Sequence, residues 1–557
     1  MATTTDSSSS ATPAPALRRF ELRGFERVAA LEDSASFKVA HVMLVRSQLD
    51  ELVRHLPQAL VLTFNKHPRM RARQVRGAFA LAEVQPPIAL DALVKSRLLG
   101  IRGTNAEEER LGKWQKHIEE ESNLPFDRFS QFPFFLRVWV NKPAGTARLI
   151  LFSDKVVSDA MSGTVVLHDL LAFASSLSLG RASLEKEKAE LPLRPSLYNM
   201  WLDNLFSAGL TKFWVKWCAA SGFKSGLKTF TPLLEPRRDQ NPMAMPPKCN
   251  ATSVLFADGA PENLKKIQAA CDREGVKIQS ALAVAVLLGY YSTQPQAMKL
   301  ALAAAQPDGE LEPEVTPTAS KKVADAAASK KSKSEPVKPF KLRMDAHIDM
   351  RRRVEYPVQE VQIGDYTTSY AVETFAREGV AMDAVKFWDL ARANKHELDA
   401  LLVSYSLPAP LIFADQNLNS RTPAKFFEDV PLPRSATADV TLANLGSYIH
   451  ASSHDFRAVD PKTKKPTTAK LTVESLHVSY TSPHLTSAAA LFVTSVKALS
   501  FGIAHKYEDK TGRQLFANLV ALIESVGDVG TNELLSDVVA RVLQQNKLVG
   551  SAAATTA

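Results

Sequence analysis

Strand-type and helix-type segments alternate along most of this chain, and this alternation limits the folds that it can adopt. Phe134–Val140 and Arg148–Phe152 read as two strands joined by a turn, and Gly163–Leu177 reads as a helix. Later in the chain the succession starts again, from a strand at Thr252–Phe256 to a helix at Arg513–Val526. Such a mixture favours an α/β fold, and its repetition predicts two similar α/β halves.

The remaining expected elements follow the same order. Gln48–Phe64 has apolar residues at helical spacing, and Pro57 should kink that helix. We expect further helices at Pro261–Arg273, Lys277–Gly289 and Met382–Leu402, and further strands at Phe340–Met350, Thr367–Thr374, Leu471–Tyr480 and Val496–His505.

The length requires more than one hydrophobic core. The chain has 557 residues, and a domain usually holds about 100–200. Apolar residues make up 45% and charged residues 23%, a balance that excludes a disordered chain, a collagen-like chain and a coiled coil. We expect a disordered tail at 1–16, an N-terminal half at 17–205, a crossover at 206–248, a C-terminal half at 249–548 and a tail at 549–557.

One internal stretch, Gln306–Pro339, differs from the rest of the chain. Acidic residues come first and lysines follow, with Ala, Ser, Thr and Pro between them. Nothing in it could pack into a core, so we predict a flexible insertion within the C-terminal half. The lysines could also bind nucleic acid, but the interspersed small residues and the adjacent acids favour a solvated loop.

Charge, cysteine content and hydropathy narrow the class of protein. The formal net charge of +9 is small for this length and gives weak support for a nucleic-acid partner. Cys218, Cys249 and Cys271 are too few and too scattered for a disulfide framework or a zinc site. The apolar stretches are shorter than the ~20 residues that a bilayer requires, and the N-terminus has no secretory signal pattern. We expect a soluble, cytoplasmic monomer without a membrane span.

The segment from Asp154 to Ala160, with the sequence Asp-Lys-Val-Val-Ser-Asp-Ala, is the most informative for function. It lies between a predicted strand and a predicted helix. Turns of this kind hold reactive side chains at the edge of a cleft, because rigid elements position them on both sides.

This segment resembles the His-His-x-x-x-Asp-Gly signature of the CoA-dependent acyltransferase superfamily. That superfamily includes nonribosomal-peptide condensation domains, alcohol acetyltransferases, polyketide-associated acyltransferases and plant BAHD enzymes. The match is closest to the alcohol acetyltransferase and polyketide-associated branch. Six further segments are similar to family segments in the same order: Asn65–Arg71, Phe134–Val140, Cys271–Ile278, Ile348–Arg351, Phe387–Arg392 and Leu442–Gly446.

The resemblance implies a fold and a reaction. The fold would be two α/β sandwich halves, each similar to a chloramphenicol-acetyltransferase subunit, with a channel between them. The reaction would be transfer of an acyl group from a CoA thioester, or less commonly from a carrier protein, to a small alcohol or amine. Acyl-CoA would then be a co-substrate, with no permanently bound cofactor and no metal. Asp159 would have a structural role and would form a buried ion pair with Arg351.

The chain departs from the signature where the chemistry matters most. In the family, the second His accepts the proton of the attacking hydroxyl or amine. Here Lys155 occupies that position and Ala160 replaces the Gly. A lysine has an ordinary pKa of about 10.4, and Asp154 alongside should favour the charged form. Lys155 is therefore better interpreted as a structural or substrate-anchoring cation than as a base.

Two alternatives to an active enzyme stay open at this point. The chain could be a catalytically degenerate relative that binds acyl-CoA, a small molecule or a protein without turnover. No other histidine replaces the base on sequence grounds: His168 reads as a packing or surface residue, and His67 as a turn residue. His450 and His454 have a spacing that would bind metal in a helix, but their surroundings read as a loop. The other alternative, nucleic-acid binding through the lysine-rich insertion, is the weaker one.

Overall fold

A computed structural model of the chain describes residues 17–29, 37–124, 126–185, 189–205, 217, 230–237, 252–294, 339–354, 358–404, 407–417, 436–460, 462–481 and 487–555. The predicted tail at 1–16 and nearly all of the predicted insertion at 306–339 lie outside the described residues, as does most of the predicted crossover at 206–248. The limits that we drew for the two halves therefore stay predictions.

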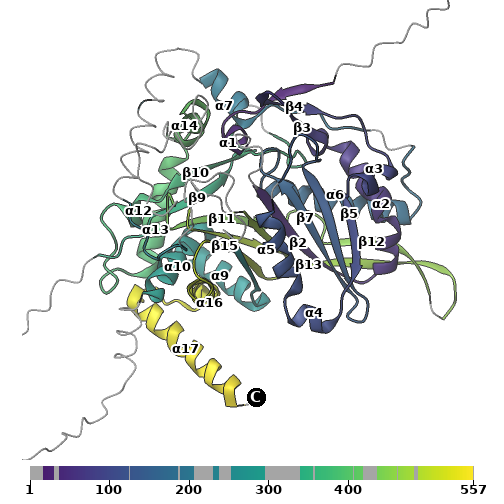
Figure 1. Ribbon diagram of the computed structural model, residues 1–557. Helices are drawn as coiled ribbons and strands as arrows, with labels where there is room; N and C mark the ends of the chain where they lie inside the picture. The colour runs from purple at the N-terminus through teal and green to yellow at the C-terminus, as the bar shows by residue number, and fades with distance from the viewer. Residues whose placement is uncertain are drawn as a thin grey trace, which may run out of the picture.

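The first large sheet is built mainly from N-terminal strands (Figure 1). Its strand order is β12 (Ser453–Val459), β13 (Pro466–Tyr480), β2 (Lys38–Arg46), β7 (Thr146–Asp154), β6 (Phe134–Asn141) and β5 (Leu99–Gly103). Neighbouring strands are antiparallel, except that β5 is parallel to β6. Two strands from late in the chain thus complete a sheet that begins near the N-terminus.

The second large sheet comes entirely from the C-terminal part of the chain. Its order is β10 (Thr367–Ala371), β9 (Met344–Asp349), β11 (Val440–Ser447), β14 (Ala489–Ser495), β15 (Leu499–His505) and β8 (Ser253–Asp258). The central strand β11 is parallel to both of its neighbours, and the other pairs are antiparallel. A small third sheet joins β1 (Arg19–Glu21), β4 (Ala78–Val84) and β3 (Ala72–Val75).

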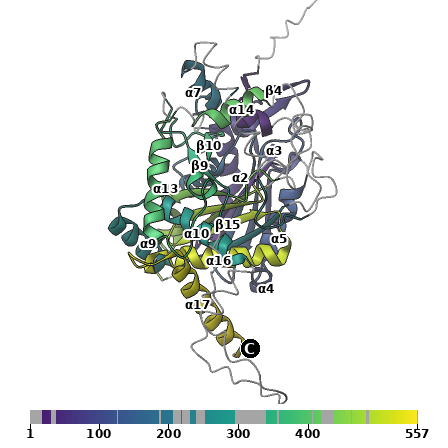
Figure 2. The ribbon, with the colours of Figure 1, turned by 90° about the vertical axis from the view of Figure 1, so that its left-hand side faces the viewer.

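Each large sheet is covered by helices on one face. In the N-terminal part these are α2 (Leu49–Lys66), which contains Pro57, and α6 (Ala160–Ser178), and they enclose one core with the sheet. In the C-terminal part, α9 (Pro261–Glu274), α10 (Ile278–Thr293), α13 (Phe387–Leu401) and α16 (Asp509–Glu524) enclose another. Figure 2 shows these four helices in front of the C-terminal strands. The remaining helices are α1 (Phe25–Ala29), α3 (Leu90–Lys95), α4 (Ala106–Arg110), α5 (Lys113–Asn123), α7 (Leu197–Leu205), α12 (Glu373–Ala376), α14 (Ala409–Asn417) and α17 (Leu535–Thr555), with 3-10 turns at Pro68–Arg71 and Val526–Asp528.

The other faces of the two sheets pack against each other. Ala40, Val42 and Ile150 from the first sheet share a buried cluster with Val254 and Ala504 from the second. A neighbouring cluster joins β2 and β13 to β11 and β14. The strands at this contact carry apolar side chains on both faces, which is why β2, β14 and β15 are buried along almost their whole length.

The fold therefore confirms the predicted class, a mixed α/β architecture built from two sheet-and-helix halves. Most predicted elements are present, with ends that shift by a few residues. Seven strands were missed from the sequence: β1, β2, β3, β4, β5, β12 and β14. Helix α17 runs through Thr555, over the stretch that we predicted as a tail.

Helix α6 is long and apolar enough to cross a membrane by length and composition alone. Within the structure it is a core helix. Its buried residues, among them Val166, Leu167 and Leu170, pack in the N-terminal core against α2 and the sheet. Core helices of globular proteins commonly pass such a test, so this helix is weak support for a membrane span.

Gly502 on β15 lies against β13 of the other large sheet. A Cβ atom at this position would lie 2.1 Å from the carbonyl oxygen of Val478 on β13. That oxygen belongs to a sheet backbone and cannot move aside as a flexible side chain would. We therefore expect Gly502→Ala to destabilise the protein by about 1–3 kcal/mol. Chemical denaturation measures this, with Gly103→Ala on β5 as the control, because nothing lies within 4 Å of a Cβ there. Equal stability of the two variants would contradict the close approach of the sheets.

Candidate functional site

The segment between β7 and α6 carries the residues that the sequence singled out. Asp159 is the N-cap of α6: its carboxylate accepts a hydrogen bond from the N–H of Ser162 at 2.8 Å. The Ser162 hydroxyl accepts a hydrogen bond from the N–H of Asp159 at 3.3 Å. This reciprocal capping begins the helix at Ala160, three residues before the predicted start at Gly163.

Asp159 and Arg351 form the buried ion pair that we expected. Both guanidinium nitrogens donate to the carboxylate, Nη1 to Oδ2 and Nη2 to Oδ1, each at 2.9 Å. The two side chains are 1% and 2% exposed. The N–H of Tyr366 adds a further hydrogen bond to Asp159 at 3.0 Å. Because Arg351 follows β9 and Asp159 precedes α6, the pair joins the two halves at the motif segment.

The surroundings of this pair keep both groups charged. Burial alone would raise the pKa of Asp159, but the charge of Arg351 and the hydrogen bonds from Arg351, Ser162 and Tyr366 outweigh it and lower that pKa. Burial opposes the charged form of Arg351 too, but the charges of Asp159 and Asp349 raise its pKa above the ordinary value. A carboxylate held in this way is a fixed anion and does not exchange protons near neutral pH.

Asp154 is not the counter-ion of Lys155, although we expected its charge to favour the charged form of that lysine. Its carboxylate pairs with Arg128 at 2.6 Å, and both side chains are almost fully buried. It also accepts a hydrogen bond from the N–H of Val156 at 3.1 Å. Successive side chains at a strand end face opposite sides, so neighbours in sequence meet different partners. Asp154 therefore fixes the shape of the motif turn from inside the N-terminal half.

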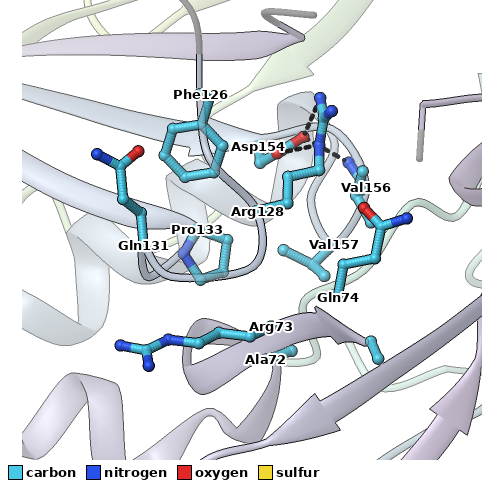
Figure 3. A pocket seen from close by; sticks show the side chains of 11 residues that line it. Ala72, Arg73, Gln74, Phe126, Arg128, Gln131, Pro133, Asp154, Val156 and Val157 are labelled. Atoms are coloured by element: carbon cyan, nitrogen blue, oxygen red, sulfur yellow. Dashed lines mark hydrogen bonds and ion pairs between the residues drawn. The ribbon is translucent and has the colours of Figure 1, made fainter. Parts of the chain in front are cut away.

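A small, open pocket lies on the Asp154 side of the turn (Figure 3). Figure 3 shows the Arg128–Asp154 pair at its edge, with Phe126 and Gln131 nearby. Lys155 is not among the residues that line it. The pocket is therefore separate from the side of the motif that faces the C-terminal half.

Lys155 finds its counter-ion in the C-terminal half. Its ammonium lies 3.0 Å from Oδ2 of Asp365, which is fully buried, while the Lys155 side chain is 24% exposed. Asp365 also accepts a hydrogen bond from the hydroxyl of Thr367 at 2.7 Å. The position that resembles the family base thus carries a cation that is paired across the contact between the halves.

A second buried ion pair lies next to Asp365. Arg69 contacts Glu26 at 2.6 Å, and both side chains are at most 2% exposed. Burial raises the pKa of Glu26 to about 7, with Arg69 opposing that rise and Asp365 adding to it. Arg69 belongs to the Asn65–Arg71 segment that resembles an early family turn. In the same segment His67, expected as a turn residue, is buried with its Nε2 2.7 Å from Asp169.

His41 on β2 lies directly behind the start of α6. Its Nε2 lies 2.7 Å from the carbonyl oxygen of Ala160, and a Cβ at Gly163 would lie 2.1 Å from the ring. Burial lowers the pKa of His41 to about 4, so the ring is neutral. Because it is fully enclosed, it supports the helix and does not reach an open site. Sequence reasoning missed it together with its strand.

Three histidines that the sequence left without a function form one cluster. The ring of His168 on α6 stacks on His450 at a centroid distance of 4.5 Å and lies 5.6 Å from His454. His454 belongs to β12, so the predicted loop there is a strand from Ser453 onward. Within the described ranges no group of His, Cys, Asp and Glu side chains has a geometry that could hold a metal ion. The cluster therefore joins α6 to β12 by packing.

Comparison with solved structures finds a similar fold in an acetyltransferase, a condensation domain and an X-domain. The trichothecene 15-O-acetyltransferase TRI3 from Fusarium sporotrichioides is 12% identical with a TM-score of 0.64, covering 93% of this chain and 97% of that one. The first condensation domain of the CDA synthetase is 12% identical with a TM-score of 0.61, covering 93% and 98%. The X-domain from teicoplanin biosynthesis is 15% identical with a TM-score of 0.52, covering 95% and 98%. At such identities the likeness shows a shared two-lobed fold.

Comparisons based on sequence give no relative. No protein-family model matches the chain, and no curated protein is similar to it at a significant level.

The Asp159–Arg351 pair makes a direct prediction for stability. Asp159→Asn keeps the shape of the side chain but leaves the buried charge of Arg351 without its main partner. Breaking a buried pair in this way typically costs about 3–5 kcal/mol. Chemical denaturation should show a loss of this size, whereas Asp91→Asn, at an exposed pair with Lys95, should leave the midpoint unchanged. If both variants unfold at the wild-type midpoint, the pair does not hold the halves together.

The histidine cluster predicts acid sensitivity. Burial and the neighbouring His450 lower the pKa of His168 to about 4, and burial also lowers the pKa values of His450 and His454. The unfolded chain therefore binds more protons below about pH 6.5, so stability falls as the pH decreases from 6.5 towards 4. His168→Phe keeps a stacked ring without a titrating group. We expect it to reduce the loss of stability over that range by an amount on the order of 2 kcal/mol, measured by urea unfolding at several pH values. An unchanged pH dependence would contradict the packing of a neutral His168.

Proposed function

We propose that this chain transfers an acyl group from a CoA thioester to a small alcohol or amine. The observation that supports this most is the construction of the motif segment: a strand-to-helix turn, fixed by the Asp159–Arg351 pair, presents Lys155 towards the other half. The similarity in fold to an O-acetyltransferase and to a condensation domain is consistent with the same class of reaction.

The reaction needs few groups from the protein. The oxygen or nitrogen of the acceptor attacks the thioester carbonyl, a C–O or C–N bond forms, and the C–S bond breaks. The proton of the acceptor is passed to the departing thiolate, so that free CoA leaves as a thiol. Acyl-CoA enters as a co-substrate and free CoA leaves, and no resident cofactor takes part in these steps.

In this proposal Lys155 acts as an anchoring cation. An ammonium group has three N–H donors, and Asp365 accepts from one of them. Because the Lys155 side chain is 24% exposed, the remaining donors can bind the thioester carbonyl oxygen as negative charge develops on it. A donor aimed at such an oxygen typically contributes about 10²–10³-fold to the rate. Asp365 holds the ammonium in place for this task.

The test is an assay of purified protein with acetyl-CoA and longer acyl-CoA thioesters against a panel of alcohols and amines. Free thiol and the mass of the ester or amide product are both measured. We expect turnover by the wild type, and a loss of about 10²–10³-fold in kcat for Lys155→Ala. Lys95→Ala, at an exposed ion pair, serves as the control and should keep the wild-type rate. Thiol release no faster than in buffer with every pair of substrates would contradict the proposal.

A second candidate function is binding without turnover. It is favoured by a specific observation, the lysine at the position that resembles the family base, held in an ion pair with Asp365. The X-domain, which has a similar fold, is known in a complex with the protein OxyB. Calorimetry with acyl-CoA, in the absence and presence of an acceptor, separates the two functions: binding without thiol release supports the second.

A further inference from the structure

His347 lies on the face of β9 that looks towards the N-terminal half. Met344 and Ala346 on the same strand are buried in the C-terminal core. Side chains alternate along a strand, so His347 and Asp349 belong to the opposite face. Asp349 confirms the direction of that face, because its carboxylate accepts from Arg351 at 3.0 Å.

The motif segment lies opposite His347. The charged groups that act on its imidazole are Lys155, which lowers its pKa, and Asp159, which raises it. Both belong to the segment between β7 and α6. On the neighbouring strand β10, the residue paired with His347 is Ser369, which is uncharged. Strand register supports this placement: Asp365, which binds Lys155, also accepts from Thr367, and Thr367 pairs with Asp349 on β9. His347 is the next residue along β9 on the same face as Asp349.

The imidazole is also available for chemistry. It is partly exposed, and within the part of the chain that the structure describes neither of its nitrogens takes part in a hydrogen bond. Partial burial, together with the charge of Lys155, lowers its pKa below the ordinary value. The ring is therefore neutral and keeps a free lone pair at physiological pH.

Other histidines near the motif are not both partly exposed and free to accept a proton from a substrate. His41 is fully buried and bonded to the carbonyl of Ala160. His67 is buried and bonded to Asp169. His168 stacks on His450 on the far side of α6, against β12.

We propose that His347 accepts the proton of the acceptor during acyl transfer, in place of the imidazole that position 155 lacks. This inference rests on the proposed function. The base would then come from the C-terminal half and the anchoring cation, Lys155, from the N-terminal half.

The step balances without any further reactant. As the acceptor oxygen or nitrogen attacks the thioester carbonyl, its proton moves to the free nitrogen of His347. When the C–S bond breaks, the imidazolium returns the proton to the thiolate of CoA. The charge of Lys155 favours the neutral ring, so the imidazolium readily returns the proton to the thiolate. His347 ends the cycle neutral.

The first experiment compares His347→Gln with wild type in the thiol-release assay. General-base catalysis typically contributes about 10²–10⁴-fold, so we expect kcat to fall by at least 10²-fold with little change in KM for acyl-CoA. His396→Gln is the matched control, because His396 is exposed on α13. The wild-type rate should be constant from pH 6 to 8, since the ring is already neutral, whereas a lysine base would give a rate that rises with pH. A His347→Gln enzyme with the wild-type rate overturns the assignment and leaves the proposed function standing.

The second experiment does not depend on turnover. NMR of protein with labelled histidines follows the titration of His347 in the wild type and in Lys155→Gln. The signal that is missing from the spectrum of His347→Gln identifies His347. Removing the nearby cation should raise the pKa of His347, because Lys155 lowers it. A pKa near 6.5 that is the same in both proteins overturns the inference, even if His347→Gln fails to fold. Absence of thiol release by the wild type, with the expected titration shift, instead rejects the proposed function and with it the catalytic role of His347.

Discussion

The ion pair between Asp159 and Arg351 is the contact on which the arrangement of this site depends. It joins the first turn of α6 to the end of β9, and therefore one half of the molecule to the other. Asp159 caps the helix with the same carboxylate that binds Arg351 and the N–H of Tyr366. A buried pair adds little net stability, because desolvation offsets its attraction, but it leaves few alternative arrangements in which both charges are satisfied.

Two charged residues next to each other in the motif turn, Asp154 and Lys155, face opposite sides of that turn. Asp154 turns inward to Arg128 and stabilises the turn within the N-terminal half. Lys155 turns outward to Asp365 in the other half. Two adjacent residues of opposite charge therefore do not neutralise each other. Because the two residues have separate partners, the ammonium of Lys155 stays at the contact between the halves. A pair between Lys155 and Asp154 would have held that ammonium within the N-terminal half.

Much of this could be predicted from the sequence, because it depends on local pattern. Strand and helix periodicity gave the two halves, and the resemblance of the motif segments led to the pair of Asp159 with Arg351. The partner of Lys155 could not be predicted, because Asp365 lies 210 positions away and carries no pattern of its own. His347 and His41 were missed for a related reason. Their roles depend on which face of a strand they occupy and on what crosses that face, and both follow from tertiary packing.

If acyl transfer proceeds as proposed, its two principal groups come from different halves. The N-terminal half supplies the anchoring ammonium of Lys155, and the C-terminal half supplies both the carboxylate that holds it and the imidazole of His347. Neither half alone then contains a working site, so catalysis depends on the contact between the halves as much as on the residues themselves. Two structural features hold the halves together at separate places. One is the close approach of Gly502 to the carbonyl of Val478, and the other is the Asp159–Arg351 pair. Structural residues distant from the thioester would thereby control the distance over which the proton moves.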